Sequence, residues 1–395
     1  MTEGSGQDTV DFDTVMAALY YQNSFRRILG DIGTIEVYIL SGRSIYIQSR
    51  SIVPLDMDIR RVQMTGGSSY VLTLPKEWIK SLQIKKNDPL GIVIREDGDL
   101  FITGNITGEM VQQKKIIEVV NESVPNSFYR TLIGAYIAGY HCIEIKSKDR
   151  VPPLIRKSIR SFADQVIGLE PVQESESAII LRDLFNPLEM PFESSLNRMY
   201  SITKEMINDS VKALISHDTA LADHVILRDR DVDRLFWLIA RQTNIILESP
   251  WNSERMNNSI TEIFHFYQTG RIIERIADHA VSIAKSIQLV DVSTVTEKTS
   301  AAVYDASQEA IKAFDISVSA FFTHDMKGAN RIIESVYLYE KTFHHINEEI
   351  FNLPTESAVH IRRISDSIRR IGEYSVDIAE GIINQGVTCS NDTLE

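Results

Sequence analysis

The chain has 395 residues, 43% of them hydrophobic, and carries 54 acidic against 41 basic residues, a formal net charge of −13. It contains no apolar run of about 18 residues, so we expect no membrane insertion, and its acidic balance argues against strong non-specific attraction to nucleic acid. Its two cysteines, Cys142 and Cys389, lie far apart, which excludes a disulfide framework and favours a reducing, cytoplasmic location.

Residues 1–56 form a segment of uncertain structure. The start is acidic and lacks the basic and then apolar order of a signal peptide. Two alternatives are open: residues 35–40 and 44–48 add a hairpin, or Met57 is the true start and residues 1–56 are an extension. We expect the second, because a folded segment begins directly after Met57. Mass spectrometry of the native N-terminus distinguishes the two.

Residues 57–104 follow the order strand, turn, strand, short helix, turn, hairpin. Gly66-Gly67 favours a tight turn, Pro75 favours the first turn of a helix, and Asp97-Gly98 favours a two-residue hairpin. This order, with the stretches Thr-Gly-Gly-Ser-Ser-Tyr and Leu-Pro-Lys-Glu-Trp, resembles the AbrB/SpoVT swapped-hairpin domain. The resemblance implies a small β-barrel that closes only when two chains pair, and therefore a homodimer.

Domains of that type often bind DNA through basic side chains on a curved dimer face. The segment 57–104 has seven Lys and Arg against six Asp and Glu, a net charge of only +1. Since neutralised phosphates dominate affinity for DNA, two interpretations stay open: a local DNA-binding patch, or dimerisation alone. The candidate DNA-binding residues are Arg60, Arg61, Lys76, Lys85 and Lys86.

Residues 105–190 are predicted to form a small α/β region. The pattern predicts strands at 115–120, 142–145 and 178–181, and helices at 127–139 and 151–166. Basic residues concentrate between Lys146 and Arg160. Such a run is usually a solvated face, although an anionic partner would bind there together with the preceding domain.

The remainder of the chain contains an internal duplication. Residues 271–284 and 367–379 are divergent copies of one helix, and residues 214–218 match residues 321–325. Apolar residues return at helical spacing between these landmarks. We therefore expect two all-α repeats, 191–290 and 291–388, each of three long antiparallel helices.

Within the first repeat, residues 226–235 and 274–284 resemble the PhoU domain, and the second repeat fits less well. The resemblance implies tandem three-helix bundles that control phosphate uptake. Together with the preceding AbrB-like domain, it implies an architecture known mostly from archaea. Helical periodicity alone says nothing about phosphate.

Paired carboxylates stand four residues apart on two of the predicted helices: Asp229 with Asp233, and Glu274 with Asp278. Each pair lies on one helix face, where like charges repel unless a cation sits between them. Oxygen ligands suit hard or borderline ions, and PhoU proteins hold metals at such motifs, so Mg, Mn, Fe or Zn is expected here. The alternative is that these acids are merely solvated.

The second repeat departs from this motif. Arg369 replaces Glu274, Glu373 replaces Asp278, and Val336 with Glu340 replace the aspartate pair. Arg369 is predicted to supply the positive charge that a cation would give.

An enzyme is not expected. A lone Glu262-x-x-His265 spacing is typical of di-iron bundles, but only one copy is present, and a packed or capping histidine is the better interpretation, as for His217, His279 and His324. No nucleophile, phosphate-loop or zinc-protease motif occurs. The prediction is a cytoplasmic, homodimeric, DNA-binding transcriptional regulator of phosphate uptake with metal-binding bundles. The alternative is an adaptor that binds phosphate-transporter or sensor-kinase components through the bundles, with the first domain serving only dimerisation.

Overall fold

The computed structural model describes most of the chain after residue 57. The described residues are 58–94 except Ser68, 98–104, 106, 113–120, 124–248, 256 and 258–389, with two short strands at 37–38 and 46–47. Side chains at 292, 336–344 and 388–389 are not among those described. The chain divides into two compact units, residues 1–109 and 110–395.

The first described elements of the first unit are two short strands, β1 (Val37–Tyr38) and β2 (Tyr46–Ile47), which pair antiparallel. The hairpin predicted from residues 35–40 and 44–48 is therefore present in these strands. The other expectations for residues 1–56, including the start at Met57, lie outside the described residues.

The head, residues 58–106, has the predicted order of elements. It comprises β3 (Gln63–Thr65), β4 (Ser69–Val71), α2 (Lys76–Ser81), β5 (Gly91–Ile94) and β6 (Leu100–Thr103). Gly66 and Gly67 have φ values of 67° and 85°, which glycine adopts without strain in the turn between β3 and β4. β5 and β6 pair antiparallel as predicted, whereas Asp97 of the predicted two-residue turn lies outside the described residues.

The head strands do not close a barrel within one chain. β3 pairs with β4 and β5 with β6, as two separate two-stranded sheets. Among the described head residues none is fully buried, and Ile59, Tyr70 and Ile94 are 83%, 76% and 76% exposed. A single copy of the head therefore leaves its apolar side chains without a core.

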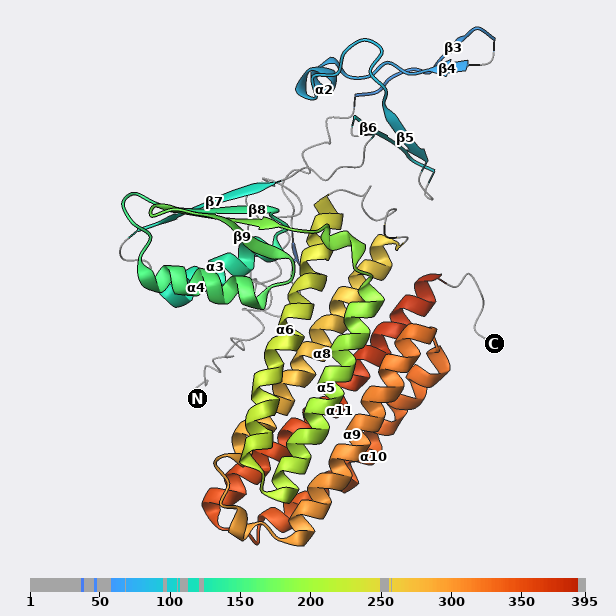
Figure 1. Ribbon diagram of the computed structural model, residues 1–395. Helices are drawn as coiled ribbons and strands as arrows, with labels where there is room; N and C mark the ends of the chain where they lie inside the picture. The colour runs from blue at the N-terminus through green and yellow to red at the C-terminus, as the bar shows by residue number, and fades with distance from the viewer. Residues whose placement is uncertain are drawn as a thin grey trace, which may run out of the picture. The chain divides into compact units, whose positions relative to one another are not determined.

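The second unit begins with an α/β domain (Figure 1). Its elements are β7 (Lys114–Val119), α3 (Pro125–Ile137), β8 (Cys142–Ser147), α4 (Pro153–Gln165), β9 (Leu169–Glu174) and β10 (Ala178–Asp183). The sheet order is β7-β8-β10-β9, with β7 parallel to β8 and the other pairs antiparallel. Both helices pack on one face of the sheet, where Leu132, Phe162 and Ile143 are fully buried.

The strand β9 was not predicted from the sequence. Of its six residues only Leu169 is buried, so it lacks the alternation of apolar residues that reveals a half-buried strand. Its pairing with β10 gives it its place at the sheet edge.

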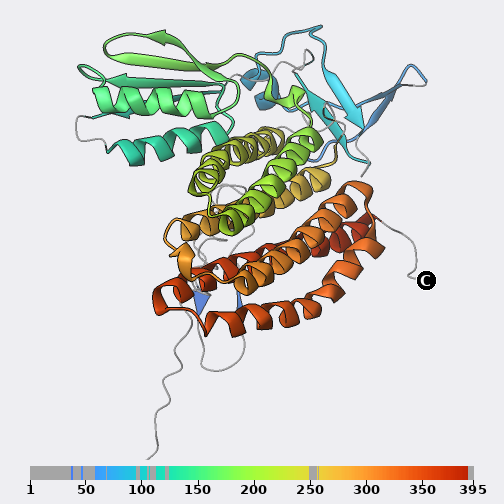
Figure 2. The ribbon, with the colours of Figure 1, turned by 60° about the horizontal axis from the view of Figure 1, so that its bottom comes forward.

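Two three-helix repeats follow, as predicted. They contain α5 (Phe192–Ser216), α6 (Thr219–Glu248) and α8 (Ile260–Ile287), then α9 (Glu297–Thr323), α10 (Met326–Ile350) and α11 (Thr355–Cys389). Short 3-10 turns, η1 (Pro187–Glu189) and η2 (Val292–Thr294), precede each repeat. Helices of the two repeats run alongside one another in Figure 2, and one hydrophobic core runs through both repeats.

The duplicated landmarks have the same structure in both repeats. His217 ends α5 and His324 ends α9, both in the left-handed conformation, with φ values of 56° and 52°. Asp218 and Asp325 follow, and each accepts a hydrogen bond from a backbone N–H in the first turn of the next helix, at 3.0 and 2.9 Å. These histidines end helices, which confirms the interpretation made from the sequence.

The α/β domain is attached to the first repeat by a buried arginine. Arg241 of α6 is fully buried, stacks on the Tyr136 ring and pairs with Asp183 at 2.7 Å. It also donates to the backbone carbonyl of Tyr140 at 3.0 Å. Because a buried guanidinium without partners would be costly, these bonds hold the α/β domain against α6. Among the described helices, none is long and apolar enough to cross a membrane.

Candidate functional site

The four predicted metal-ligand carboxylates lie on two neighbouring helices. Asp229 and Asp233 stand on α6, and Glu274 and Asp278 stand on α8. Asp229, Asp233 and Glu274 are half-buried, and Asp278 is exposed. The Glu274 side chain is only 14% exposed, so it is not a freely solvated acid.

The carboxylates on α6 and α8 act on one another electrostatically. Burial raises the pKa of Asp233 to about 7, and the charges of three neighbouring carboxylates add to the shift. Burial, reinforced by Asp278, also raises the pKa of Asp229. Burial raises the pKa of Glu274 too, although Arg271 opposes that shift by donating to both carboxylate oxygens at 3.1 Å. Nearby positive charge, such as that of Arg271, therefore balances only part of the negative charge of the cluster.

The ligand atoms of this cluster suit a hard cation, but the arrangement of the side chains does not form a metal site. The oxygen-only donor set suits magnesium, manganese or iron, and a cation would relieve the repulsion that raises these pKa values. Within the part of the chain that the structure describes, however, no three His, Cys, Asp or Glu side chains are grouped as a ligand set for one ion. The side chains of these four residues would therefore have to move closer together to hold one ion.

The corresponding face of the second repeat is neutralised by arginine. Arg369 donates to Glu373 on the next turn of α11, as predicted, and Arg370 donates to the other oxygen of Glu373 at 2.9 Å. The side chains of Val336 and Glu340, at the positions of the aspartate pair, lie outside those described. The two repeats thus differ in how they balance charge at equivalent positions.

The five candidate DNA-binding residues of the head are all exposed. Arg60 is not free, because its guanidinium pairs with Asp58 and donates to Thr73 Oγ1 at 3.3 Å. The hydrogen bond from Arg60 lowers the pKa of Asp58. Lys76 begins α2, and Lys85 and Lys86 lie in the turn that follows this helix. The available positive charge of the head is therefore mainly on Arg61 and the lysines.

The remaining polar candidates have local structural partners. Glu262 accepts the backbone N–H of Ser259 at 2.7 Å in a capping box at the start of α8, and His265 is buried, which lowers its pKa. In the basic run between Lys146 and Arg160, Lys146 pairs with Glu144 at 3.2 Å. Sequence reasoning missed the buried pair of Arg241 with Asp183, since no periodic signal links residues so far apart.

Two parts of the chain match known family models. Residues 196–287 and 303–382 match the family model of the PhoU domain. Residues 63–103 match the family model described as antidote-toxin recognition MazE, bacterial antitoxin. The two helical repeats therefore match the PhoU domain and the head matches the MazE type, as the resemblances implied.

Individual relatives carry the same family name. The chain is 39% identical over 90 residues to the phosphate-specific transport system accessory protein PhoU homolog of Aquifex aeolicus, covering 22% of this chain and 39% of that protein. It is 23% identical over 195 residues to the homolog from Rhizobium meliloti, covering 47% of this chain and 80% of that protein.

Among solved structures, the phosphate transport system regulatory protein PhoU from Streptococcus pneumoniae is 16% identical, covers 51% of this chain and 96% of its own, and has a TM-score of 0.43. PhoU from Pseudomonas aeruginosa is 21% identical, covers 50% of this chain and 96% of its own, and has a TM-score of 0.41.

Proposed function

We propose that this protein is a cytoplasmic regulator of phosphate uptake that works as a homodimer and binds DNA through its paired heads. The main support is the union of two PhoU domains with a MazE-type head in one chain. The relatives of the bundles are named as accessory proteins of phosphate-specific transport, a regulatory and not an enzymatic role.

Dimerisation through the head is supported by its exposed apolar residues. Ile59, Tyr70 and Ile94 are more than three-quarters exposed in one chain, and exposed apolar surface of this kind marks an interface. A second head would cover these side chains and pair the open strand edges. Two heads also double the number of basic side chains that one DNA duplex meets.

Metal binding at Asp229, Asp233, Glu274 and Asp278 is the second part of the proposal. It is supported by the raised pKa values of the three half-buried carboxylates, which a cation would lower again. Chemically, the ion would be magnesium, manganese, iron or zinc. Its role would be to fix the relative positions of α6 and α8.

A second candidate function is an adaptor that binds transporter or sensor-kinase components through the bundles. The low charge of the head favours it, because Arg60 is tied to Asp58 and the segment 57–104 carries a net charge of only +1. In that case the head would serve only dimerisation.

Salt-dependent DNA binding separates the two candidates. The full chain is mixed with fluorescent DNA from its own promoter region at several salt concentrations, with and without divalent metal. Two results support the regulator. The binding resists competitor DNA, and the slope of log affinity against log salt concentration decreases by about one unit in each of Lys85→Ala and Lys86→Ala. Lys298→Ala on α9 is the control and should change neither.

The regulator candidate is contradicted if the promoter DNA does not bind, or if its affinity equals that of competitor DNA at every salt concentration. The phosphate role has its own test, because unchanged expression of phosphate-responsive genes in a deletion strain would count against both candidates.

A further inference from the structure

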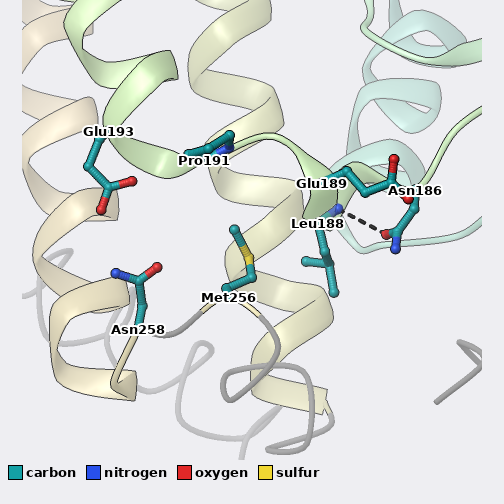
Figure 3. A pocket seen from close by; sticks show the side chains of 7 residues that line it. All are labelled: Asn186, Leu188, Glu189, Pro191, Glu193, Met256 and Asn258. Carbon is teal, nitrogen blue, oxygen red and sulfur yellow. Dashed lines mark hydrogen bonds between the residues drawn. The ribbon is translucent and has the colours of Figure 1, made fainter.

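A hollow among the described residues lies where the first repeat begins. It has a volume of about 460 Å³ and lies between η1, the start of α5 and the residues before α8 (Figure 3). Its lining residues are Asn186, Leu188, Glu189, Pro191, Glu193, Met256 and Asn258. Figure 3 shows Glu193 and Asn258 pointing toward each other across it.

A second hollow, of about 100 Å³, adjoins the first and shares Glu193 and Asn258 with it. It lies between the two repeats, because Glu262 and Phe266 come from α8, while Phe321 and Phe322 end α9. The three phenylalanines form a continuous aromatic floor. The rings of Phe266 and Phe321 meet edge to face at 5.4 Å, and those of Phe321 and Phe322 at 5.5 Å.

Acidic side chains predominate among the described residues that line the two hollows. Glu189, Glu193 and Glu262 are acidic, none of the described lining residues is a lysine or an arginine, and His324 also lines the smaller hollow. The Glu193 carboxylate lies in the first turn of α5 and has no hydrogen bond or ion pair to any described residue. Glu262 uses one oxygen in its capping box with Ser259, which leaves the other available.

Acidic rims above aromatic rings match one type of side chain. Arginine and lysine combine a charge that carboxylates bind with a flat or slender form that lies on an aromatic face. The larger hollow adds Leu188 and the flexible Met256, which suit an apolar side chain of variable shape. A free metal ion would not use the aromatic floor, and a nucleic acid would be repelled by the glutamates.

We propose that the two hollows together form a docking site for a basic peptide segment of a partner protein. An arginine or lysine of the partner enters the small hollow between Glu193 and Glu262, above Phe322. An apolar residue next to it in the partner lies against Leu188 and Met256. Since both repeats line the small hollow, the segment contacts both PhoU domains at once.

The identity of the partner rests on the adaptor candidate above, whereas the preference for a basic segment does not. Cytoplasmic loops of membrane transporters carry an excess of lysine and arginine, so such a loop has the chemistry that this site selects.

Peptide binding to the full chain tests the proposal. The probe is a fluorescein-labelled heptapeptide with a central arginine flanked by leucines, and the matched peptide has citrulline, a neutral isostere, in place of arginine. We expect the arginine peptide to bind about tenfold more tightly by fluorescence anisotropy. The double substitution Glu193→Gln and Glu262→Gln should remove this preference, and Phe322→Leu should reduce it.

The variants preserve the fold by design. Glutamine at position 262 still accepts the Ser259 N–H through its side-chain oxygen, because Gln and Glu both serve in a capping box. The matched control is Glu297→Gln, which removes the same charge from the first turn of α9, outside both hollows. This control should leave binding unchanged within about twofold.

The proposal is overturned if the two peptides bind equally, if neither binds, or if the double variant binds as the original protein does. Promoter-DNA binding, measured on the same samples, reports on the proposed function separately. If the double variant loses peptide selectivity but still binds DNA as the original protein does, the peptide site is separate from the DNA-binding function.

Discussion

The two helical repeats share a core but not a charged face. In the described residues, both repeats have three long helices, the same left-handed histidine at the end of the first helix, and the same aspartate cap at the start of the second. On the third helix, however, Glu274 lies in a cluster of acids with raised pKa values, whereas Glu373 pairs with two arginines. The duplication thus kept what folding requires and changed what lies near the surface.

The largest expected effect tests the shared core. Ile276 and Ile371 occupy equivalent positions and are both fully buried. Substituting either by alanine should lower the free energy of unfolding by about 2–5 kcal/mol, because lost burial and a new cavity add together. Urea denaturation measures it, with the exposed Leu227→Ala as the control. A cost below about 1 kcal/mol in only one domain would show that the cores are not equivalent.

The next effect belongs to the acidic face of the first domain alone. The folded pKa of Asp233 is about 7, above its ordinary value of 3.8, so the folded protein holds a proton that the unfolded chain releases. Its stabilising contribution is therefore present below about pH 4 and is lost as the pH rises through 7. After allowance for partial exposure, we expect the protein to lose roughly 1–2 kcal/mol from this group between those pH values.

Asp233→Asn should flatten that part of the stability profile, measured by urea denaturation across pH. Added manganese should raise the melting temperature of the original protein at pH 8 more than that of the variant. An unchanged pH profile in Asp233→Asn would show that the carboxylates are solvated and uncoupled, and would remove the main support for the metal site.

A smaller and symmetrical effect is expected at the helix caps. Asp218→Ala and Asp325→Ala should each cost about 1 kcal/mol, because each leaves a backbone N–H without its partner. Asparagine at either position keeps the bond and serves as the control. Chemical denaturation at neutral pH compares them, and a cost at only one position would mean that the two turns differ in strength.

The smallest effect is expected at the arginine pair of the second domain. Arg369→Met should change the free energy of unfolding by less than about 1 kcal/mol, because Arg369 and Glu373 are 43% and 35% exposed and Arg370 remains. Added salt should reduce this difference further. A cost above about 2 kcal/mol would contradict this expectation. It would indicate that the ion pair stabilises the second domain as strongly as a structural metal would.

Elements with periodic apolar residues were predictable, and elements without them were not. All six bundle helices and the strands β7, β8 and β10 follow from such patterns, whereas β9 does not, because only Leu169 in it is buried. The sequence left open that Glu274 is merely solvated, because a local pattern cannot show that α6 packs against that side of α8. For the same reason the basic residues of the head were identified, but not the attachment of Arg60 to Asp58.

The sequence by itself determined the architecture: a head of β-strands, an α/β domain and two related helical domains, because local periodicity and turn residues act over a few residues at a time. Only the tertiary structure decided which carboxylates interact electrostatically. It also decided that Arg241 holds the α/β domain on α6 and that Glu193 and Phe322 line one hollow. These relations join residues that are distant in the chain, and burial and charge act through space.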